Sequence, residues 1–88
     1  MIYLVNYDLK VPGRDYTKLY ETLKATHGWW HYLESTWILH TTEPLVNVRQ
    51  RIQAVLDTND RFIIVDITGK ARDGWLPKDA WEWIDQRQ

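Results

Sequence analysis

One carboxylate stands at a place in the sequence where catalytic and metal-binding groups are often held. Asp8 follows the strand-like run Ile-Tyr-Leu-Val-Asn-Tyr at residues 2–7 and precedes a loop that contains Pro12 and Gly13. A rigid strand can hold such a side chain at the rim of a cleft, and Mg²⁺ prefers oxygen ligands such as carboxylates. Asp8 is therefore the candidate catalytic and metal-binding residue. The plainer alternative is a strand-end side chain that caps a turn.

A second carboxylate and a set of basic residues are candidates for the same region. Asp66 lies among apolar neighbours near the end of the last strand-like run, where a buried Asp needs a partner or a shifted pKa. If the last strand lies near the first, Asp66 and Asp8 share one region; otherwise Asp66 is an ordinary hydrogen-bonded residue. Basic side chains in two loops near that sheet end form a candidate rim for phosphate contacts, or are simply solvated loop charges. These candidates are Lys10, Arg14, Lys18, Lys70 and Arg72.

Tryptophan is unusually frequent in this chain. There are six among 88 residues, and each brings a large apolar surface and one N–H group that needs a partner. A domain of this size cannot easily bury all of them, so we expect Trp37, Trp75 and Trp81 at an interface. Trp29, Trp30 and Trp37 fit a core or an interface better than a platform for stacked bases, which stays the alternative.

Other kinds of site are excluded or unsupported. The chain has no cysteine, so disulfides, thiolate catalysis and cysteine zinc sites are ruled out. Its three histidines lack the spacing of a metal motif, and no glycine-rich phosphate loop is present. The net charge of −1, without a run of like charges, argues against strong nonspecific nucleic-acid binding by a monomer. No signal peptide or membrane span is recognisable, so a cytoplasmic location without a membrane partner is expected.

The elements that must position these residues follow from hydrophobic periodicity. The order strand, helix, strand, strand, helix, strand predicts a two-layer α+β sandwich of ferredoxin-like type with a short C-terminal helix. One domain is expected over residues 1–88, with its core over 2–68 and a tail over 69–88. Its helices are expected at 16–27, 44–56 and 77–87, and strands at 2–8 and 61–68. Residues 29–33 and 36–41 are extended runs that form either two strands with a tight link at Glu34-Ser35 or one long bent strand with a bulge.

The order and spacing of several short segments resemble a known family. The run Leu-Val-Asn-Tyr-Asp-Leu at residues 4–9 resembles the first strand of the small CRISPR-associated endonuclease-like subunit of the spacer-acquisition complex, which typically ends in an aromatic-Asp pair. Residues 30–39 are similar to that family's second and third strands, which are joined at a serine, here Ser35; Glu43-Pro44 then opens the second helix. The chain resembles the small SinR-like proteins more closely still, and the virulence-associated protein D ribonucleases look like relatives of the same fold.

The resemblance implies a homodimer built on the sheet, in which the strand-end Asp of each subunit faces its twin. In some members that Asp pair is credited with metal-dependent cleavage of RNA or DNA, whereas in the acquisition complex the subunit is a scaffold for DNA. Only Asp8 matches a catalytic position of the family. The chain departs from the family in its sparser basic residues and in its tail, which contains Gly-Trp-Leu-Pro-Lys at residues 74–78.

Two functions therefore stand side by side. The first is a Mg²⁺-dependent endoribonuclease, endodeoxyribonuclease or phosphodiesterase that uses two Asp8 carboxylates of a homodimer. The second is a non-catalytic dimeric binding or adaptor module for a nucleic acid, a nucleotide or a protein partner, serving a mobile element or a defence or counter-defence system. An open, paired Asp8 favours the first function, and an Asp8 buried against an arginine favours the second.

Overall fold

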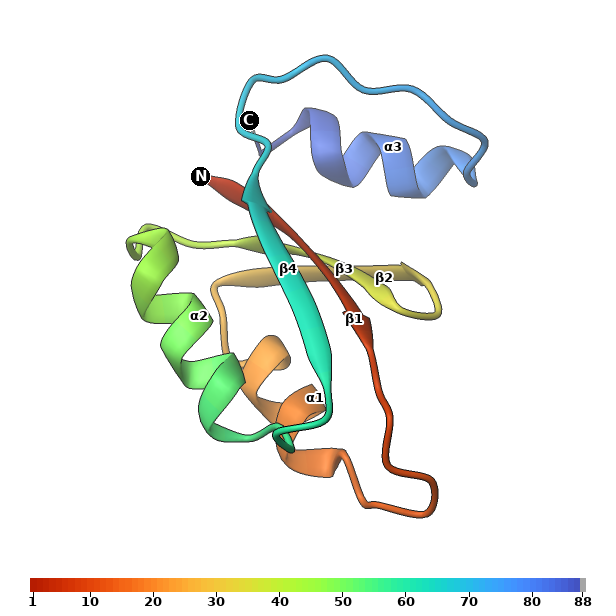
Figure 1. Cartoon of the computed structure of the whole chain (residues 1–88). Coiled ribbons are helices and arrows are strands. Elements are labelled where there is room, and N and C mark those ends of the chain that lie inside the picture. The colour runs from red at the N-terminus through yellow and green to blue at the C-terminus, as the bar shows by residue number, and fades with distance from the viewer. Residues whose placement is uncertain (88) are drawn as a thin grey trace.

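The computed structural model describes residues 1–87 and has an α+β architecture of four strands and three helices (Figure 1). The elements expected from periodicity all form, with bounds that differ from expectation by a few residues; position 88, the end of the expected tail, lies outside the described residues. None of the helices in residues 1–87 is long and apolar enough to span a bilayer. The elements are β1 Ile2–Asp8, α1 Thr17–Lys24, β2 Gly28–Leu33, β3 Thr36–His40, α2 Leu45–Ala54, β4 Arg61–Asp66 and α3 Lys78–Asp85.

The four strands form one antiparallel sheet in the order β2-β3-β1-β4. β1 is a central strand because both of its faces are apolar at its start: Ile2 and Tyr3 point to opposite sides and both are buried. β2 and β3 are joined by the two residues Glu34 and Ser35, and their pairing shifts register between Trp30 and Leu33. Residues 29–41 therefore form two strands with a tight link, the first of the two alternatives, and not one long bent strand.

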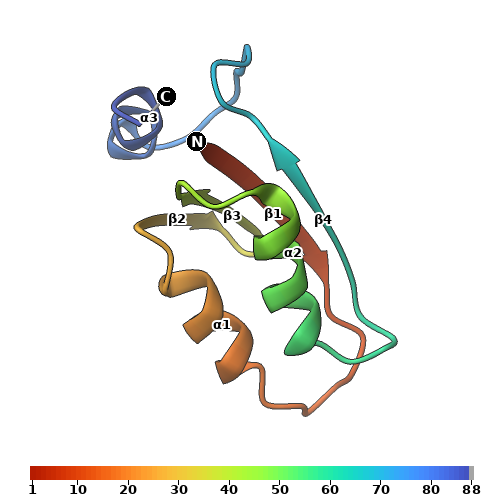
Figure 2. The ribbon, with the colours of Figure 1, turned by 90° about the vertical axis from the view of Figure 1, so that its left-hand side faces the viewer.

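The first face of the sheet is covered by α1 and α2, which lie together along the strands (Figures 1 and 2). Leu19 and Leu23 of α1 are four residues apart and both are buried, as are Val48 and Ile52 of α2, so each helix turns one apolar stripe inward. The core that they close also contains Tyr3, Val5, Tyr7, Trp37 and Leu39 from the sheet.

The second face is covered only in part, by α3, which lies apart from the other helices and beside the N-terminus (Figures 1 and 2). The α3 residues Ala80 and Ile84 are buried against Ile2, Trp30 and Ile38. The indole Nε1 of Trp30 donates a hydrogen bond of 3.1 Å to the Ala80 carbonyl, so the buried N–H of this tryptophan has a partner.

The rest of the second face is exposed. Ile63 and Val65 of β4 are 59% and 42% exposed and lie on the same side of the strand, so they place apolar surface side by side. Register places Leu4 beside Val65 and Asn6 beside Ile63, and the same row ends with Asp8 beside Arg61. Leu4 is half-buried, whereas the other members of this region are exposed. We call the region formed by Leu4, Asn6, Asp8, Ile63 and Val65 the open sheet face.

Candidate functional site

Asp8 lies where expected, as the last residue of β1. Its side chain is 64% exposed, and the Lys10 ammonium lies 2.6 Å from its Oδ2 atom. Arg61 is the register partner of Asp8 on β4, but its guanidinium donates to the carbonyls of Thr58 and Asp60, at 3.0 and 2.9 Å. Asp8 is therefore an open carboxylate with one neighbouring ammonium, and it is not buried against an arginine.

A shallow groove of about 260 Å³ lies beside this carboxylate. Within it the Asn6 amide donates to Thr36 Oγ1 at 2.7 Å and to the Ser35 carbonyl at 3.3 Å, which fixes its orientation. The lining residues are Asn6, Tyr7, Asp8, Arg61, Phe62 and Ile63. A larger hollow, of about 590 Å³, lies along β4 and the end of α2, and Asp8 does not line it. The Asp8 groove thus has room for one small polar group and is no deep substrate pocket.

The donor set of a single chain does not fit a Mg²⁺ site. Within residues 1–87 no three His, Asp or Glu side chains gather closely enough to hold a metal ion. Asp8 contributes one carboxylate, and the Lys10 ammonium already neutralises it at 2.6 Å. Mg²⁺ in proteins is usually held by one or two carboxylates together with waters and phosphate oxygens, and another copy of the chain could supply a second carboxylate.

Asp66 does not share the region of Asp8, contrary to one of the two expectations. β4 runs antiparallel to β1, so Asp66 pairs with Tyr3 at one end of the sheet while Asp8 pairs with Arg61 at the other. Asp66 accepts hydrogen bonds from the Thr68 hydroxyl at 2.6 Å and the Thr68 amide at 3.0 Å, and these bonds lower its pKa. Asp66 is therefore an ordinary hydrogen-bonded residue, which was the second of the two expectations.

The expected basic rim is divided between the two ends of the sheet. Lys70 and Arg72 follow the end of β4, which lies beside the start of β1, so they are remote from Asp8. The Arg72 guanidinium lies 2.8 Å from Asp85 of α3 and also donates to the Lys70 carbonyl. These two residues therefore do not form one rim with the basic residues of the β1–α1 loop, and the expectation of a shared rim was wrong.

The basic residues on the Asp8 side of the molecule also have different environments. Lys10 contacts Asp8, and Lys18 lies exposed on α1. Arg14 is half-buried: its guanidinium lies 3.3 Å from Asp57 and donates to the Val55 carbonyl at 3.2 Å. Arg14 thus fastens its loop to the end of α2, while Lys10 and Lys18 remain accessible cations.

The three tryptophans expected at an interface have three different environments. Trp37 is 1% exposed and lies in the core, where its Nε1 donates to the Tyr7 hydroxyl at 3.1 Å, so it is not available to a partner. Trp81 is partly buried against the cluster beneath α3. Trp75 is 99% exposed and is the only one of the three whose whole side chain is free to meet another molecule.

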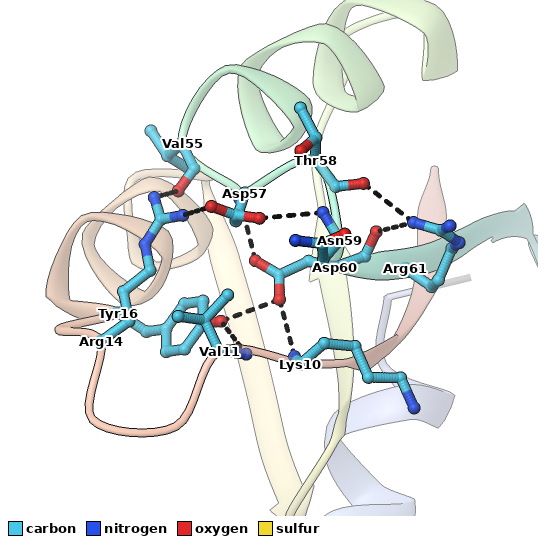
Figure 3. A network of polar contacts seen from close by, with 10 residues as sticks. All are labelled: Lys10, Val11, Arg14, Tyr16, Val55, Asp57, Thr58, Asn59, Asp60 and Arg61. Atoms are coloured by element: carbon cyan, nitrogen blue, oxygen red, sulfur yellow. Dashed lines mark hydrogen bonds and ion pairs between the residues drawn. The ribbon is translucent and has the colours of Figure 1, made fainter.

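A buried carboxylate that sequence reasoning missed lies close to the candidate site (Figure 3). Asp60 is 7% exposed; its Oδ1 accepts from the Lys10 amide and the Tyr16 hydroxyl, both at 2.8 Å, and its Oδ2 accepts from the Asp57 amide at 2.9 Å. These bonds join the loop after β1 to the turn before β4. Asp60 therefore positions the chain around Lys10, and hence the ammonium beside Asp8.

The electrostatics of this network favour a charged Asp60. Burial alone raises the pKa of its carboxyl, but the hydrogen bonds from Lys10, Asp57 and Tyr16, with the nearby Arg14, outweigh burial and lower it. Burial and the bond to Asp60 raise the pKa of the Tyr16 phenol, which stays a donor. The partners of Asp60 lie up to 50 residues away in the sequence, so no local pattern predicts this network. The sequence showed only that residues 57–60 form a polar turn.

Comparison with known proteins adds no functional assignment. No protein-family model matches the sequence, and no curated protein matches it either. The features of the chain that bear on its function are an open carboxylate at a strand end, a neighbouring lysine and an exposed apolar sheet face.

Proposed function

We propose that this protein is a homodimeric, nucleic-acid-associated protein of ferredoxin-like fold, in which two Asp8 carboxylates form a Mg²⁺-dependent phosphodiesterase or nuclease centre. The fold assignment is supported by the antiparallel order β2-β3-β1-β4, with one helix after β1 and one after β3. The resemblance of residues 4–9 and 30–39 to the CRISPR-associated and SinR-like proteins supports the same assignment. A cytoplasmic location is part of the proposal.

The observation that carries the proposal is the position of Asp8 on the open sheet face. Ile63 and Val65 expose apolar surface there, in the same face as Asp8, and a second copy is a natural cover in a small domain. A twofold axis through this face presents the same residues from both subunits. Both Asp8 side chains would then border one interface, which supplies the second carboxylate that a single chain lacks.

The residues around Asp8 have chemistry suited to a phosphodiester. Lys10 and Arg61 place two cationic groups around the groove, where they would contact phosphate oxygens. Asn6 adds a neutral side-chain amide that its contacts to residues 35 and 36 hold in place. A Mg²⁺ ion held by two Asp8 carboxylates would supply Lewis-acid catalysis and activation of water.

The dimer leads to a first testable prediction. The wild-type protein should scatter light as a particle of twice 10.6 kDa at high micromolar concentration. Ile63→Lys should shift the mass to that of the monomer, because burying a lysine ammonium in an apolar interface is unfavourable. Val46→Lys is the matched control, since Val46 is 47% exposed on α2 and should leave the dimer intact. A wild-type monomer at every concentration would contradict the dimer.

The catalytic proposal has its own test. Purified wild type is incubated with labelled single- and double-stranded RNA and DNA, with Mg²⁺, Mn²⁺ or chelator. Cleavage should require the metal, and Asp8→Asn should abolish it while the melting temperature stays within a few degrees, because Asp8 is exposed and its ion pair with Lys10 lies at the surface. Asp73→Asn, an exposed carboxylate change on the tail, should retain activity. Equal cleavage by wild type and Asp8→Asn would refute the role of Asp8.

One observation favours the non-catalytic alternative. The Lys10 ammonium lies 2.6 Å from Asp8 and occupies one side of a carboxylate that belongs to no group of three metal-ligating side chains within residues 1–87. Such a pair can serve a binding or adaptor module for nucleic acid, nucleotide or protein without any reaction. Retention of a labelled oligonucleotide without cleavage, whatever the metal, would select this alternative.

A further inference from the structure

A second groove, independent of Asp8, lies between α1 and the edge strand β2. It has a volume of about 390 Å³ and shares no lining residue with the Asp8 groove. Aromatic side chains dominate it, and one lysine is its only permanently charged member. We call it the aromatic groove; its lining residues are Tyr20, Lys24, Trp29, His31 and Trp37.

The rings of this groove are supported from behind. Trp37 is buried, and the His31 ring stacks on it with centroids 3.9 Å apart and planes 16° apart. Trp29 lies 5.4 Å from Trp37, measured between ring centroids, yet remains 42% exposed. Trp29 and His31 are two residues apart on β2, so they point to the same side of the sheet. The groove thus presents flat aromatic surface held on a rigid strand.

A lysine ammonium lies over this aromatic surface. The Lys24 ammonium, from the last turn of α1, lies 5.1 Å from the centre of the Trp29 ring. None of the five lining residues is acidic, so the lining itself carries one positive charge, that of Lys24, although the whole chain carries −1. An occupant that complements the groove therefore combines a flat ring system with a negative charge.

We propose that the aromatic groove binds an unpaired nucleotide, with its base stacked on Trp29 and its phosphate on Lys24. Stacking of a base on an aromatic side chain is stronger than an exposed cation–π contact, so the base can displace the ammonium from the ring. The flexible lysine stem then lets the ammonium meet the phosphate. Because the groove is open to solvent, both a free nucleotide and a nucleotide within a single strand can reach it, whereas a base inside a duplex cannot stack there.

The binding of AMP tests this proposal. The indole N–H signals of the protein in ¹H–¹⁵N spectra report each tryptophan separately. AMP should shift the Trp29 signal saturably, adenosine more weakly and ribose 5-phosphate hardly at all. Trp75, which is 99% exposed but outside the groove, reports nonspecific stacking and should not move. A five-residue oligoadenylate that binds better than AMP would identify a single strand as the source, and equal binding would identify the free nucleotide.

Substitutions test the base contact of Trp29 and the phosphate contact of Lys24 separately. Trp29→Ala should weaken AMP binding by about tenfold or more, as expected for loss of one stacked base, and Trp29→Phe should recover part of it. Lys24→Ala should weaken AMP binding to the level of adenosine, whereas Trp75→Ala should bind as wild type. Equal movement of the Trp29 and Trp75 signals, or unchanged AMP affinity in Lys24→Ala, would overturn the proposal. Asp8→Asn should bind AMP normally, so failure of the nuclease proposal would not affect this result.

Discussion

Deletion of residues 75–88 is expected to lower the free energy of unfolding by about 4–6 kcal/mol, since burial of each large apolar side chain contributes roughly 1.5–3 kcal/mol. α3 contributes Ile84 and Ala80 to the second face, and its removal exposes Trp30 and Ile38, which are now 2% and 4% exposed. It also removes the carbonyl acceptor of the Trp30 indole N–H. Because domains are stable by only about 5–15 kcal/mol, the truncated chain should be close to unfolding at room temperature.

Urea denaturation of the wild-type and truncated chains measures this effect. Ile84→Ala is the milder variant and should cost about 2–4 kcal/mol, as is usual for large-to-small changes in a core. Trp75→Ala is the matched control within the same segment, because Trp75 is 99% exposed and should change monomer stability little. The measurements belong at low protein concentration, where a dimer would not add to stability. An unchanged midpoint in the truncated chain would show that α3 is a loose appendage.

Asp60→Ala is expected to cost about 3 kcal/mol or more, because buried partners of a charged acceptor lose their hydrogen bonds. The substitution leaves the Tyr16 hydroxyl and the amides of Lys10 and Asp57 without this acceptor. It also frees the loop that carries Lys10, so the Lys10–Asp8 pair should become less ordered. Urea denaturation measures the stability, and amide hydrogen exchange at Lys10 should increase with it.

The pH dependence of the same carboxyl gives an independent check. Its pKa in the folded chain lies below the ordinary value of 3.8, so the stability it contributes is complete above that value and is lost as pH falls through the folded pKa. The difference in stability between wild type and Asp60→Asn should therefore be constant from pH 7 to 5 and should shrink below pH 3.8. A gap that persists in acid would show that Asp60 does not act through its charge.

Local patterns in the sequence were sufficient for the elements and for the placement of Asp8 at a strand end. A continuous apolar run, here residues 2–5, marks a strand that is covered on both sides, and β1 is central for that reason. Helical spacing of Leu19 with Leu23 and of Val48 with Ile52 marks the buried stripes of α1 and α2. These features depend on neighbours within a few residues, so they can be derived before any long-range contact is known.

Tertiary structure alone decided which residues meet. Strand direction separated Asp66 from Asp8, because an antiparallel neighbour places its end beside the start of β1. Packing placed Trp37 in the core and left Trp75 exposed, although their residue type is the same. Asp60 found Tyr16 through a contact across 44 residues, and no local pattern encodes such a pairing. Local propensity determines elements, whereas the apolar area that each face can bury determines how they assemble, and therefore which polar side chains become neighbours.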